Sequence, residues 1–306
     1  MIVNNIQKLK KSLNSNNLSI YLFHGVIKKK LNNDSIRNYN SKHIHQNKFE
    51  KYIKFLSKNG QAITLNDIDD KKIKYRNKYI ITFDDGFYNN YKYALPILKK
   101  YNVPHIIYLT TNYIDKNLIS WIDRIDLAID KCSQPFIYSS ILKKKFKLGS
   151  KKNKIIFLDF IRKYFKSLKK IDLNHFTQKL LKDLKLISSR TSEDDLDKKL
   201  EWKHVIKMSK NNLTEFGGHS HNHNVLGHLS KSQYSNEINR SLNFLIRKGK
   251  LKIKHYSYPE GFKSSYNKNI IKILKKNNIE TCVTTLSNKN KKNKHSLFEL
   301  KRIFVI

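Results

Sequence analysis

The chain has 306 residues, of which 62 are basic and 24 acidic, and its formal charge is +38. Hydrophobic residues make up 39%, enough to bury the core of one large α/β domain or two small ones. The lysines are spread along the whole chain without a nucleic-acid motif, so we attribute the charge to composition and expect no nucleic-acid partner.

The two cysteines, Cys132 and Cys282, are too few and too far apart to form a disulfide framework or a thiolate metal site. No apolar run approaches the ~18 residues of a membrane span, and the N-terminus lacks the apolar core of a signal peptide. We therefore expect a cytoplasmic protein. Its basic surface also suits an anionic glycan, a nucleotide-linked sugar or peripheral contact with the inner face of a membrane.

Short apolar runs alternate along the chain with longer amphipathic stretches, which is typical of a parallel sheet or barrel. We predict strands at Leu18–Phe23, Tyr79–Phe83, His105–Leu109, Thr214–Phe216, Lys254–Tyr258, Glu280–Thr284 and Arg302–Ile306. We predict helices at Asn47–Asn59, Asn89–Tyr101, Trp202–Asn211, Ser230–Lys248 and Ser265–Asn278. Pro96 lies inside the second of these and predicts a helix start or a kink there.

Residues 132–200 are lysine-rich, have helical periodicity and lack strand signals. One helix face is apolar, and it comprises Phe157, Leu158, Ile161, Phe165 and Leu168. We interpret the segment as a helical insertion that packs this face on the main domain. A lid over a site and a basic surface that lies on a membrane are the alternatives.

Polar and turn residues follow the predicted strands at the point where each strand ends. They are His24-Gly25, Asp84-Asp85-Gly86, Thr110-Thr111-Asn112, Gly217-Gly218-His219 and Pro259-Glu260-Gly261. In (β/α) barrels the carboxyl ends of the strands form the catalytic face. The pattern therefore predicts a functional site at this end of the barrel.

Asp84 and Asp85 are adjacent carboxylates at a predicted strand end. Neighbouring side chains of an extended chain point to opposite sides, so one carboxylate can bind a metal ion while the other acts as a base. The alternative interpretation is an Asp-Asp-Gly turn or a helix N-cap.

A second cluster consists of His219, His221 and His223. Residues four apart on a helical turn share one face, which favours His219 and His223 as metal ligands, while His221 competes through a His-x-His spacing. A histidine-rich surface loop is the alternative. With one carboxylate, two histidines suit Zn²⁺, Fe²⁺, Co²⁺ or Ni²⁺ with open positions. Such a set predicts metal-assisted hydrolysis of an amide or ester.

These residues stand in strings that resemble a known family, the polysaccharide deacetylases or NodB-homology carbohydrate esterases. Ile81–Gly86 resembles the first motif of the family, Glu215–His223 the second and Tyr256–Gly261 the third. Phe23–Val26 looks like the start of a subgroup of exopolysaccharide deacetylases. The resemblance covers residues 18–306 outside the insertion. It implies a distorted (β/α) barrel of seven or eight strands, formed by a single domain of residues 1–306.

By this resemblance Asp84 is the general base, and Asp85, His219 and His223 bind one divalent metal ion. Zn²⁺ is the first expectation, with Co²⁺, Ni²⁺ and Fe²⁺ as alternatives. The implied substrate is an N-acetylated saccharide, as a polysaccharide or its precursor. Hydrolysis would release acetate and leave a free amine.

The chain departs from the family at two positions. Many members carry an arginine two residues before the third-motif proline, where this chain has Ser257, and many have a late Leu-x-His motif that is missing here. We predict His24 as the general acid, the alternative being a strand-end histidine satisfied by the backbone. Arg302 is a candidate partner for Asp84.

We also predict substrate contacts, at Tyr258, Pro259, Gly261, Trp121 and Arg302. Trp121 and Trp202 suit either stacking on a sugar or a place in the core. Two rival functions remain. The missing arginine and histidine motivate a catalytically weak, glycan-binding protein on the same fold, and the charge alone motivates a nucleic-acid-binding protein.

Overall fold

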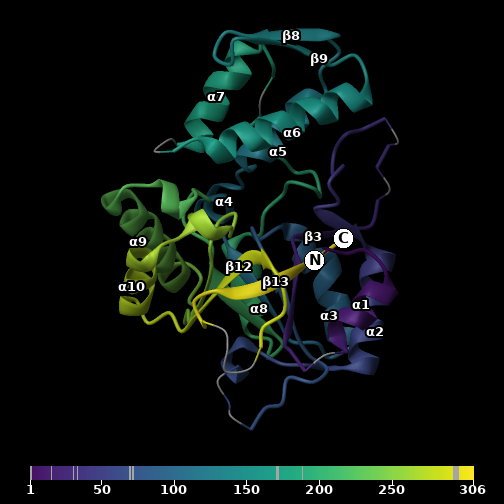
Figure 1. Ribbon diagram of the computed structural model, residues 1–306, viewed down its shortest axis with the longest axis vertical. Helices are drawn as coiled ribbons and strands as arrows, with labels where there is room; N and C mark the ends of the chain where they lie inside the picture. The colour runs from purple at the N-terminus through teal and green to yellow at the C-terminus, as the bar shows by residue number, and fades with distance from the viewer. Residues whose placement is uncertain are drawn as a thin grey trace.

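The computed structural model describes residues 2–14, 16–29, 31–32, 34–68, 70, 72–169, 172–187, 189–291 and 296–306. In this part of the chain seven parallel strands close into a barrel (Figure 1). In ring order they are β2 (Ser19–Phe23), β6 (Lys78–Phe83), β7 (His105–Leu109), β10 (Thr214–Gly218), β11 (His255–Ser257), β12 (Thr281–Ser287) and β13 (Leu300–Val305). Pairing of β13 with β2 closes the ring. The predicted (β/α) barrel and its strands are confirmed.

Short strands and turns extend the barrel. β1 (Ile2–Val3) pairs with β13, and β5 (Gln61–Ala62) pairs with β6. β3 (Gly25–Ile27) and β4 (His43–His45) form a separate parallel pair directly after β2. Three 3₁₀ turns occupy Leu65–Asp67, Leu226–His228 and Lys263–Ser265.

Helices cover the outside of the barrel (Figure 1). They are α1 (Ile6–Leu13), α2 (Gln46–Asn59), α3 (Leu95–Lys100), α4 (Thr111–Lys116), α8 (Trp202–Ser209), α9 (Lys231–Arg247) and α10 (Lys268–Lys276). The helix predicted at Asn89–Tyr101 differs, because it begins with a π-helical turn at Asn90–Ala94 that runs into α3. Pro96 lies in the first turn of α3, where its missing N–H removes no required hydrogen bond.

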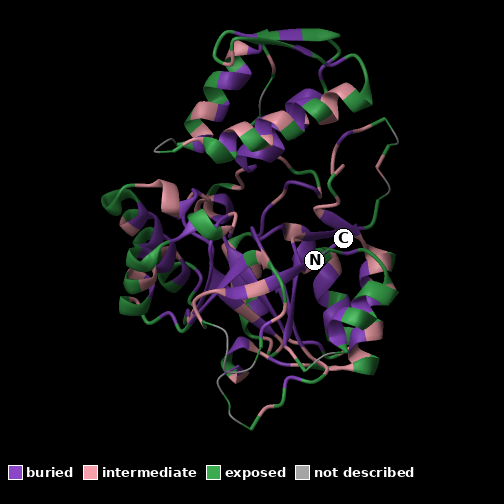
Figure 2. Cartoon of the chain, viewed as in Figure 1, coloured by how far each residue is buried: buried purple, intermediate pink, exposed green. Residues whose placement is uncertain are grey.

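The barrel strands are buried on both faces, as in parallel sheets covered by helices. Every residue of β2 and of β7 is buried, and after Ser19 and His105 these strands are continuous apolar runs rather than alternating patterns. Figure 2 shows the strands buried and the outer faces of the surrounding helices exposed. This continuous burial is why short apolar runs predicted the strands within two or three residues.

Residues 121–187 form a second apolar core beside the barrel. It is built from α5 (Trp121–Asp130), β8 (Phe136–Ser139), β9 (Lys144–Lys147), α6 (Lys151–Ser167) and α7 (Leu173–Asp183). Phe157, Leu158, Ile161 and Phe165 of α6 are buried within this core, together with residues of α5 and α7. Phe165 of this face stacks on Trp121 of α5, outside residues 132–200, and packs on Phe176 of α7 within them, so the apolar face of α6 contacts both parts.

One sequence prediction for this region needs correction, because the antiparallel pair β8–β9 contradicts the expected lack of strand signals. The second core also includes Ile36 and residues of α5, which lie outside residues 132–200. The division into one domain of residues 1–306 with an insertion at 132–200 stays a prediction. Both cysteines are buried and form no disulfide. Among the described residues, no helix is both long and apolar enough to cross a membrane.

Candidate active site at the carboxyl ends of the barrel strands

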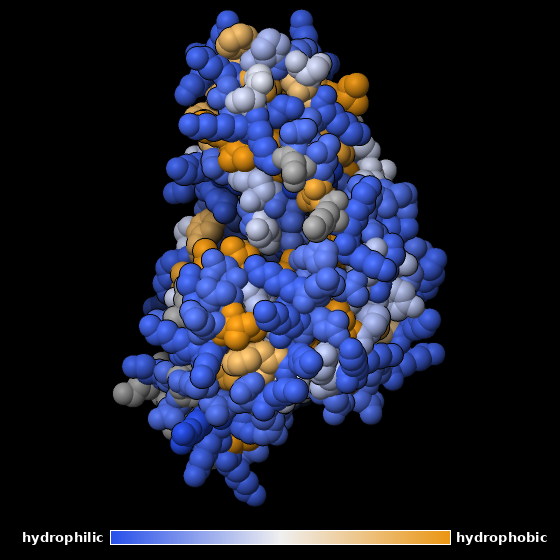
Figure 3. Space-filling model, turned by 90° about the vertical axis from the view of Figure 1, so that its right-hand side faces the viewer, coloured by the Kyte–Doolittle hydropathy of each residue, from blue (hydrophilic) through white to orange (hydrophobic). Residues whose placement is uncertain are grey.

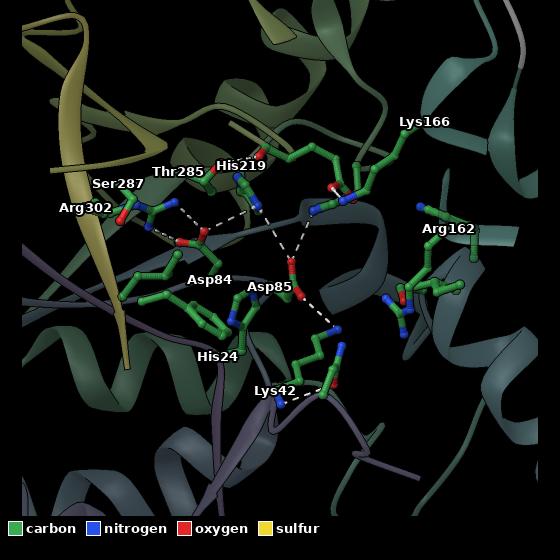
Figure 4. A pocket seen from close by; sticks show the side chains of 18 of the residues that line it. His24, Lys42, Asp84, Asp85, Arg162, Lys166, His219, Thr285, Ser287 and Arg302 are labelled. Atoms are coloured by element: carbon green, nitrogen blue, oxygen red, sulfur yellow. Dashed lines mark hydrogen bonds and ion pairs between the residues drawn. The ribbon is translucent and has the colours of Figure 1, made fainter. Parts of the chain in front are cut away.

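The carboxyl ends of the strands border a cavity of about 530 Å³. Its lining includes His24 after β2, Asp84 and Asp85 after β6, His219 after β10 and Arg302 within β13 (Figure 4). The backbone continues the strand pairing up to these residues, since the Asp84 N–H donates to Phe23 O at 3.1 Å and the His219 N–H to Leu109 O at 3.0 Å. The barrel therefore brings together side chains that lie up to 278 positions apart in sequence.

Three potential metal ligands converge beside this cavity. Asp85 Oδ1 lies 3.6 Å from His219 Nε2 and 3.3 Å from His223 Nε2, and the three ligand atoms lie within 4.8 Å of one another. The Nδ1 of His219 donates a hydrogen bond to Ser257 O at 2.8 Å. Because a carbonyl only accepts, Nε2 of the neutral imidazole carries the lone pair. A lone pair that faces a buried carboxylate favours a cation between them, so the donor set fits a divalent metal ion.

Electrostatics keep His219 and Asp85 in forms suited to a cation, whereas at His223 the effect of burial is outweighed by Asp85, which raises the pKa of this histidine. Burial lowers the pKa of His219 to about 4, so its imidazole is neutral at pH 7. Burial acts to raise the pKa of Asp85, but Lys42 and His223 outweigh burial and hold that pKa well below its ordinary value. Asp85 is therefore ionised at neutral pH.

The backbone is left-handed at several of these positions. Asp85 has φ = 72°, Ser220 and His223 each have φ = 60°, and Gly86 has φ = 72°. Non-glycine residues seldom adopt this conformation, and its strain is commonly found at functional sites. At Gly86 the turn also excludes a side chain, because a Cβ would lie 2.6 Å from Ile114.

Asp84 is held by a buried arginine on the other side of the cluster. Arg302 Nη1 donates to Asp84 Oδ1 and Arg302 Nη2 to Asp84 Oδ2, both at 2.7 Å. Arg302 also donates to Ser257 Oγ at 3.1 Å and to Thr284 O at 2.9 Å. Burial raises the pKa of Asp84, but the Arg302 guanidinium outweighs it, so the pKa is lowered overall.

Comparison with known proteins agrees with this geometry. A family model described as polysaccharide deacetylase matches residues 71–282. The chain belongs to the polysaccharide deacetylase family. It is 37% identical over 81 residues to YxkH of Bacillus subtilis (strain 168), whose name places it in the same family. That match spans 24% of this chain and 29% of YxkH.

Solved deacetylase structures share the fold of the chain at low sequence identity. The Streptococcus pyogenes deacetylase PplD, in complex with acetate, has a TM-score of 0.58 at 15% identity, over 95% of this chain and 92% of PplD. IcaB from Ammonifex degensii has a TM-score of 0.57 at 14% identity, over 95% of this chain and 93% of IcaB. A de-N-acetylase from Aggregatibacter actinomycetemcomitans has a TM-score of 0.54 at 15% identity, over 94% of each chain.

The sequence suggested that the usual arginine partner of Asp84 is missing, but in the structure Arg302 is this partner. Many polysaccharide deacetylases place an arginine at the position of Ser257, and here Ser257 instead shares the contact between Arg302 and Asp84. The structure thus brings Arg302 to Asp84, as one of the two roles predicted for it. Arg302 also lines the cavity although its side chain is fully buried, and its predicted contact with substrate stays a prediction.

His24 lines the cavity and lies between Asp84 and Lys42 in the close-up (Figure 4). Its ring packs edge-on against Phe304, with centroids 5.7 Å apart, and burial lowers the pKa of His24. Asn90 Nδ2 donates to the backbone carbonyl of His24 at 3.0 Å, which fixes the backbone and leaves the ring to the cavity. The position is compatible with the predicted acid role, which stays a prediction.

His221 points away from the ligand cluster. Its Nδ1 shares a hydrogen bond with Thr111 Oγ1 at 2.8 Å, and its ring packs on Phe244 with centroids 5.0 Å apart. Glu237 of α9 accepts from the backbone N–H groups of His221 at 3.0 Å and of Asn222 at 2.8 Å. These contacts hold the loop so that His219 and His223, and not His221, face Asp85.

Three other predicted substrate contacts, Tyr258, Pro259 and Gly261, lie outside the lining of the cavity. Tyr258 is fully buried and its hydroxyl donates to Phe298 O at 3.1 Å, so its side chain does not reach the cavity. Pro259 is buried and Gly261 (φ = 60°) packs against Thr285, whose N would lie 2.5 Å from a Cβ at Gly261. Glu260 of this turn and Thr285 of β12 line the cavity instead.

The two tryptophans occupy different places. Trp121 lines the cavity but is only 2% exposed, and it stacks on Phe165 with centroids 4.7 Å apart and planes 3° apart. One ring face is therefore covered by the insertion core. Trp202 lies outside the cavity and donates from Nε1 to Asp115 Oδ1 at 2.9 Å.

Lys42 is a residue of the site that the sequence did not reveal. Its Nζ lies 3.2 Å from Asp85 Oδ2 and 2.9 Å from Asp123 Oδ2 (Figure 4). Burial acts to lower the pKa of Lys42, but Asp123 and Asp85 outweigh it and raise the pKa. One lysine in a chain with 62 basic residues carries no motif signal that would have found it.

The insertion supplies another part of the cavity wall. Arg162 and Lys166 of α6 line the cavity opposite the barrel (Figure 4). Lys166 Nζ lies 2.8 Å from Glu260 Oε2, and Arg162 Nη2 lies 2.9 Å from Asp126 Oδ2. The Lys166–Glu260 ion pair therefore joins the insertion to the barrel loop at the mouth of the site.

Proposed function

We propose that this protein hydrolyses N-acetyl groups of amino sugars in a polysaccharide or its precursor, with one divalent metal ion bound by Asp85, His219 and His223. The observation that carries the proposal is the placement of Asp84. Its Oδ2 lies 3.9 Å from His219 Nε2, at the edge of the ligand cluster, while Arg302 holds the carboxylate from behind.

A bound divalent ion would polarise the acetyl carbonyl and lower the pKa of a water towards about 7. Asp84 is ionised at that pH and is next to the ligand cluster, so its carboxylate accepts the proton of the attacking water. The two hydrogen bonds from Arg302 fix the orientation of the carboxylate and leave further lone pairs for this proton.

His24 is proposed to give a proton to the leaving nitrogen. It enters the cavity from β2, next to the strand that carries Asp84, so the two groups act on the same bond from one barrel face. Burial lowers the pKa of His24, and the neighbouring Asp85 and Asp84 carboxylates oppose this effect without reversing it. Acetate and a free amino sugar are the products.

Zn²⁺ is the proposed ion, because two imidazoles and one carboxylate with an open position are a common zinc ligand set. Co²⁺, Ni²⁺ and Fe²⁺ suit the same donors. The cytoplasmic location expected from the sequence stays a prediction.

Acetate release from N-acetylated glucosamine oligosaccharides tests the proposal. We expect release by the metal-loaded protein, loss after treatment with a chelator, and recovery when Zn²⁺ or Co²⁺ is added back. Tight binding of metal and oligosaccharide without acetate release would favour the glycan-binding alternative.

A further inference from the structure

The hairpin β8–β9 forms the outer end of the insertion, far from the barrel (Figure 1). Along β8 the side chains alternate, with Ile137 and Ser139 buried and Phe136 and Tyr138 exposed by 47% and 61%. Ile141, in the turn that follows, is 36% exposed. Two aromatic side chains and one aliphatic side chain of the hairpin are thus exposed to solvent.

Lysines share this outer face of the hairpin. Phe136 pairs across the two strands with Lys147, and Tyr138 pairs with Lys145. Side chains of directly paired residues point to the same face of a sheet, so all four lie on the outer face. Lys145 Nζ also lies 4.6 Å from the centroid of the Phe136 ring.

The segment that carries the hairpin has charges of one sign in its sequence, and Asp183 of α7 is a carboxylate that the structure places at its turn. Residues 131–154 contain no aspartate or glutamate and eight lysines, which are Lys131, Lys143, Lys144, Lys145, Lys147, Lys151, Lys152 and Lys154. Figure 3 shows apolar side chains among hydrophilic ones at this upper end of the molecule. The surface is therefore complementary to a negatively charged partner that also accepts apolar groups.

The turn is held in place rather than free to fold back. Asp183 of α7 accepts hydrogen bonds from the Ser139 hydroxyl at 2.5 Å and from the Ile141 N–H at 3.3 Å, and it also bonds to Ser140. On the inner face Ile137 and Phe146 are buried in the insertion core. The exposure of Phe136, Tyr138 and Ile141 is thus built into the insertion.

We propose that the hairpin β8–β9 docks the protein on an anionic lipid bilayer. Phe136, Tyr138 and Ile141 enter the interface, and the surrounding lysines contact the anionic headgroups. A nucleic acid would use the lysines but would offer no apolar layer to Ile141, so the bilayer is the better fit. The inference stands independently of the proposed catalytic function.

Docking at this end has a consequence for the cavity. Helix α6 packs on the hairpin through Phe157, whose ring centroid lies 4.9 Å from that of Phe146. The same helix lines the cavity with Arg162 and Lys166. A bilayer-bound hairpin would therefore hold the cavity at a fixed distance from the membrane surface.

Co-sedimentation of the full chain with vesicles tests the proposal. We expect binding to phosphatidylcholine vesicles that contain about one third phosphatidylglycerol, and much weaker binding to pure phosphatidylcholine. Replacing Lys143, Lys145 and Lys147 by serine should weaken binding by on the order of tenfold to a hundredfold. The matched control replaces Lys268, Lys272 and Lys276 of α10, which are also exposed, and should bind nearly as the wild type does.

Variants of the apolar side chains distinguish entry into the bilayer from simple charge attraction. The variant Phe136→Ser with Tyr138→Ser should bind anionic vesicles at least about tenfold more weakly, while Ile246→Ser, at a site 54% exposed on α9, should not. Wild-type binding by the aromatic variant would overturn the proposal. So would binding that depends only on the lysines and is abolished equally by RNA, since that outcome indicates a polyanion site.

A fluorescence measurement keeps the test independent of folding defects. Phe136→Trp should show a blue shift and quenching by brominated lipids beyond the signal of the wild type, which already contains Trp121 and Trp202. Ile246→Trp is the matched control and should show neither. Absence of quenching at position 136 in vesicle-bound protein would overturn the proposal.

Discussion

Arg302 and Asp84, 218 positions apart, form a two-bonded ion pair in which both terminal nitrogens of the arginine contact the carboxylate at 2.7 Å. The arginine side chain is fully buried and Asp84 is 4% exposed. Many relatives are expected to supply this arginine from the position of Ser257, in the strand β11. Here β13 supplies it, and Ser257 keeps a hydrogen-bonding role beside it.

The variant Arg302→Met measures how much the Arg302–Asp84 ion pair contributes to stability and to acetate release. It leaves Asp84 buried without its cation, so we expect a loss of about 3–5 kcal/mol in the free energy of unfolding. The rate of acetate release should fall by about 10²-fold or more, because the base is misoriented and its pKa rises. Thermal unfolding and steady-state kinetics measure the two effects, and an unchanged kcat would contradict the role given to the pair.

The pH dependence of stability has a definite sign for this pair. The pKa of Asp84 in the folded protein is lower than its ordinary value of about 3.9. The pair therefore stabilises the protein fully above pH 3.9, and this stabilisation is lost as the pH falls through the lower, folded value. Melting temperatures of wild type and Arg302→Met should differ most near neutral pH and converge in acid. A constant difference down to pH 2 would argue against an ionised Asp84.

Returning the arginine to the family position should rescue part of the loss. Ser257 Oγ lies 3.4 Å from Asp84 Oδ2 and 3.1 Å from Arg302 Nη2. The side chains at positions 257 and 302 therefore both reach the carboxylate of Asp84. We expect Ser257→Arg combined with Arg302→Ser to be at least about tenfold more active than Arg302→Ser alone. Ser257→Arg by itself should be destabilised by about 1–3 kcal/mol through overpacking. No recovery in the double variant would mean that position 302 acts by another route.

Much of the barrel and of the ligand cluster was predictable because each signal is local. Several of the buried strands, such as β2 and β6, contain short apolar runs, and His219 and His223 are recognisable by spacing and by motif. The contact between Arg302 and Asp84 depends on the closure of the barrel between β13 and β2, so the sequence could only suggest it. Arg302 and Asp84 come close because β2 pairs with both β13 and β6.

Other features carried too little local signal. Lys42 stands in a loop of a lysine-rich chain, and its role depends on Asp123 and Asp85, which reach it from other parts of the chain. Strand β9 reads Lys-Lys-Phe-Lys and has a single apolar residue, Phe146, so its sequence resembles a polar loop. Tyrosine is a common ligand-binding residue, but Tyr258 packs on Tyr266, with ring centroids 4.3 Å apart, and lies in the core.

The choice between the histidines is open to direct test. Asp85→Asn and His223→Ala should each reduce bound metal to a small fraction of one ion per chain, because each removes a ligand. His221→Ala should keep nearly the full metal content, since His221 bonds to Thr111 and faces away from the cluster. Elemental analysis after dialysis measures the ratio. Loss of metal in His221→Ala with retention in His223→Ala would reverse the assignment.

The proposed acid role of His24 predicts a dependence on the leaving group. His24→Asn should slow acetate release from an N-acetyl sugar by at least about tenfold, because the amine must be protonated as it leaves. Hydrolysis of an activated aryl acetate, whose leaving group needs no proton, should change little. His221→Asn is the matched control for losing an imidazole outside the cavity. Equal losses on both substrates would remove His24 from the acid role.

The most direct test of the account measures bound metal and acetate release in the same preparation of Asp84→Asn. Asparagine is close in size and can still bond to Arg302 and Ser257, but it cannot accept the proton of the attacking water. We predict wild-type metal content with acetate release reduced by about 10²- to 10⁴-fold. Metal content near that of the wild type with undiminished acetate release would contradict Asp84 as the base and, with it, the proposed mechanism.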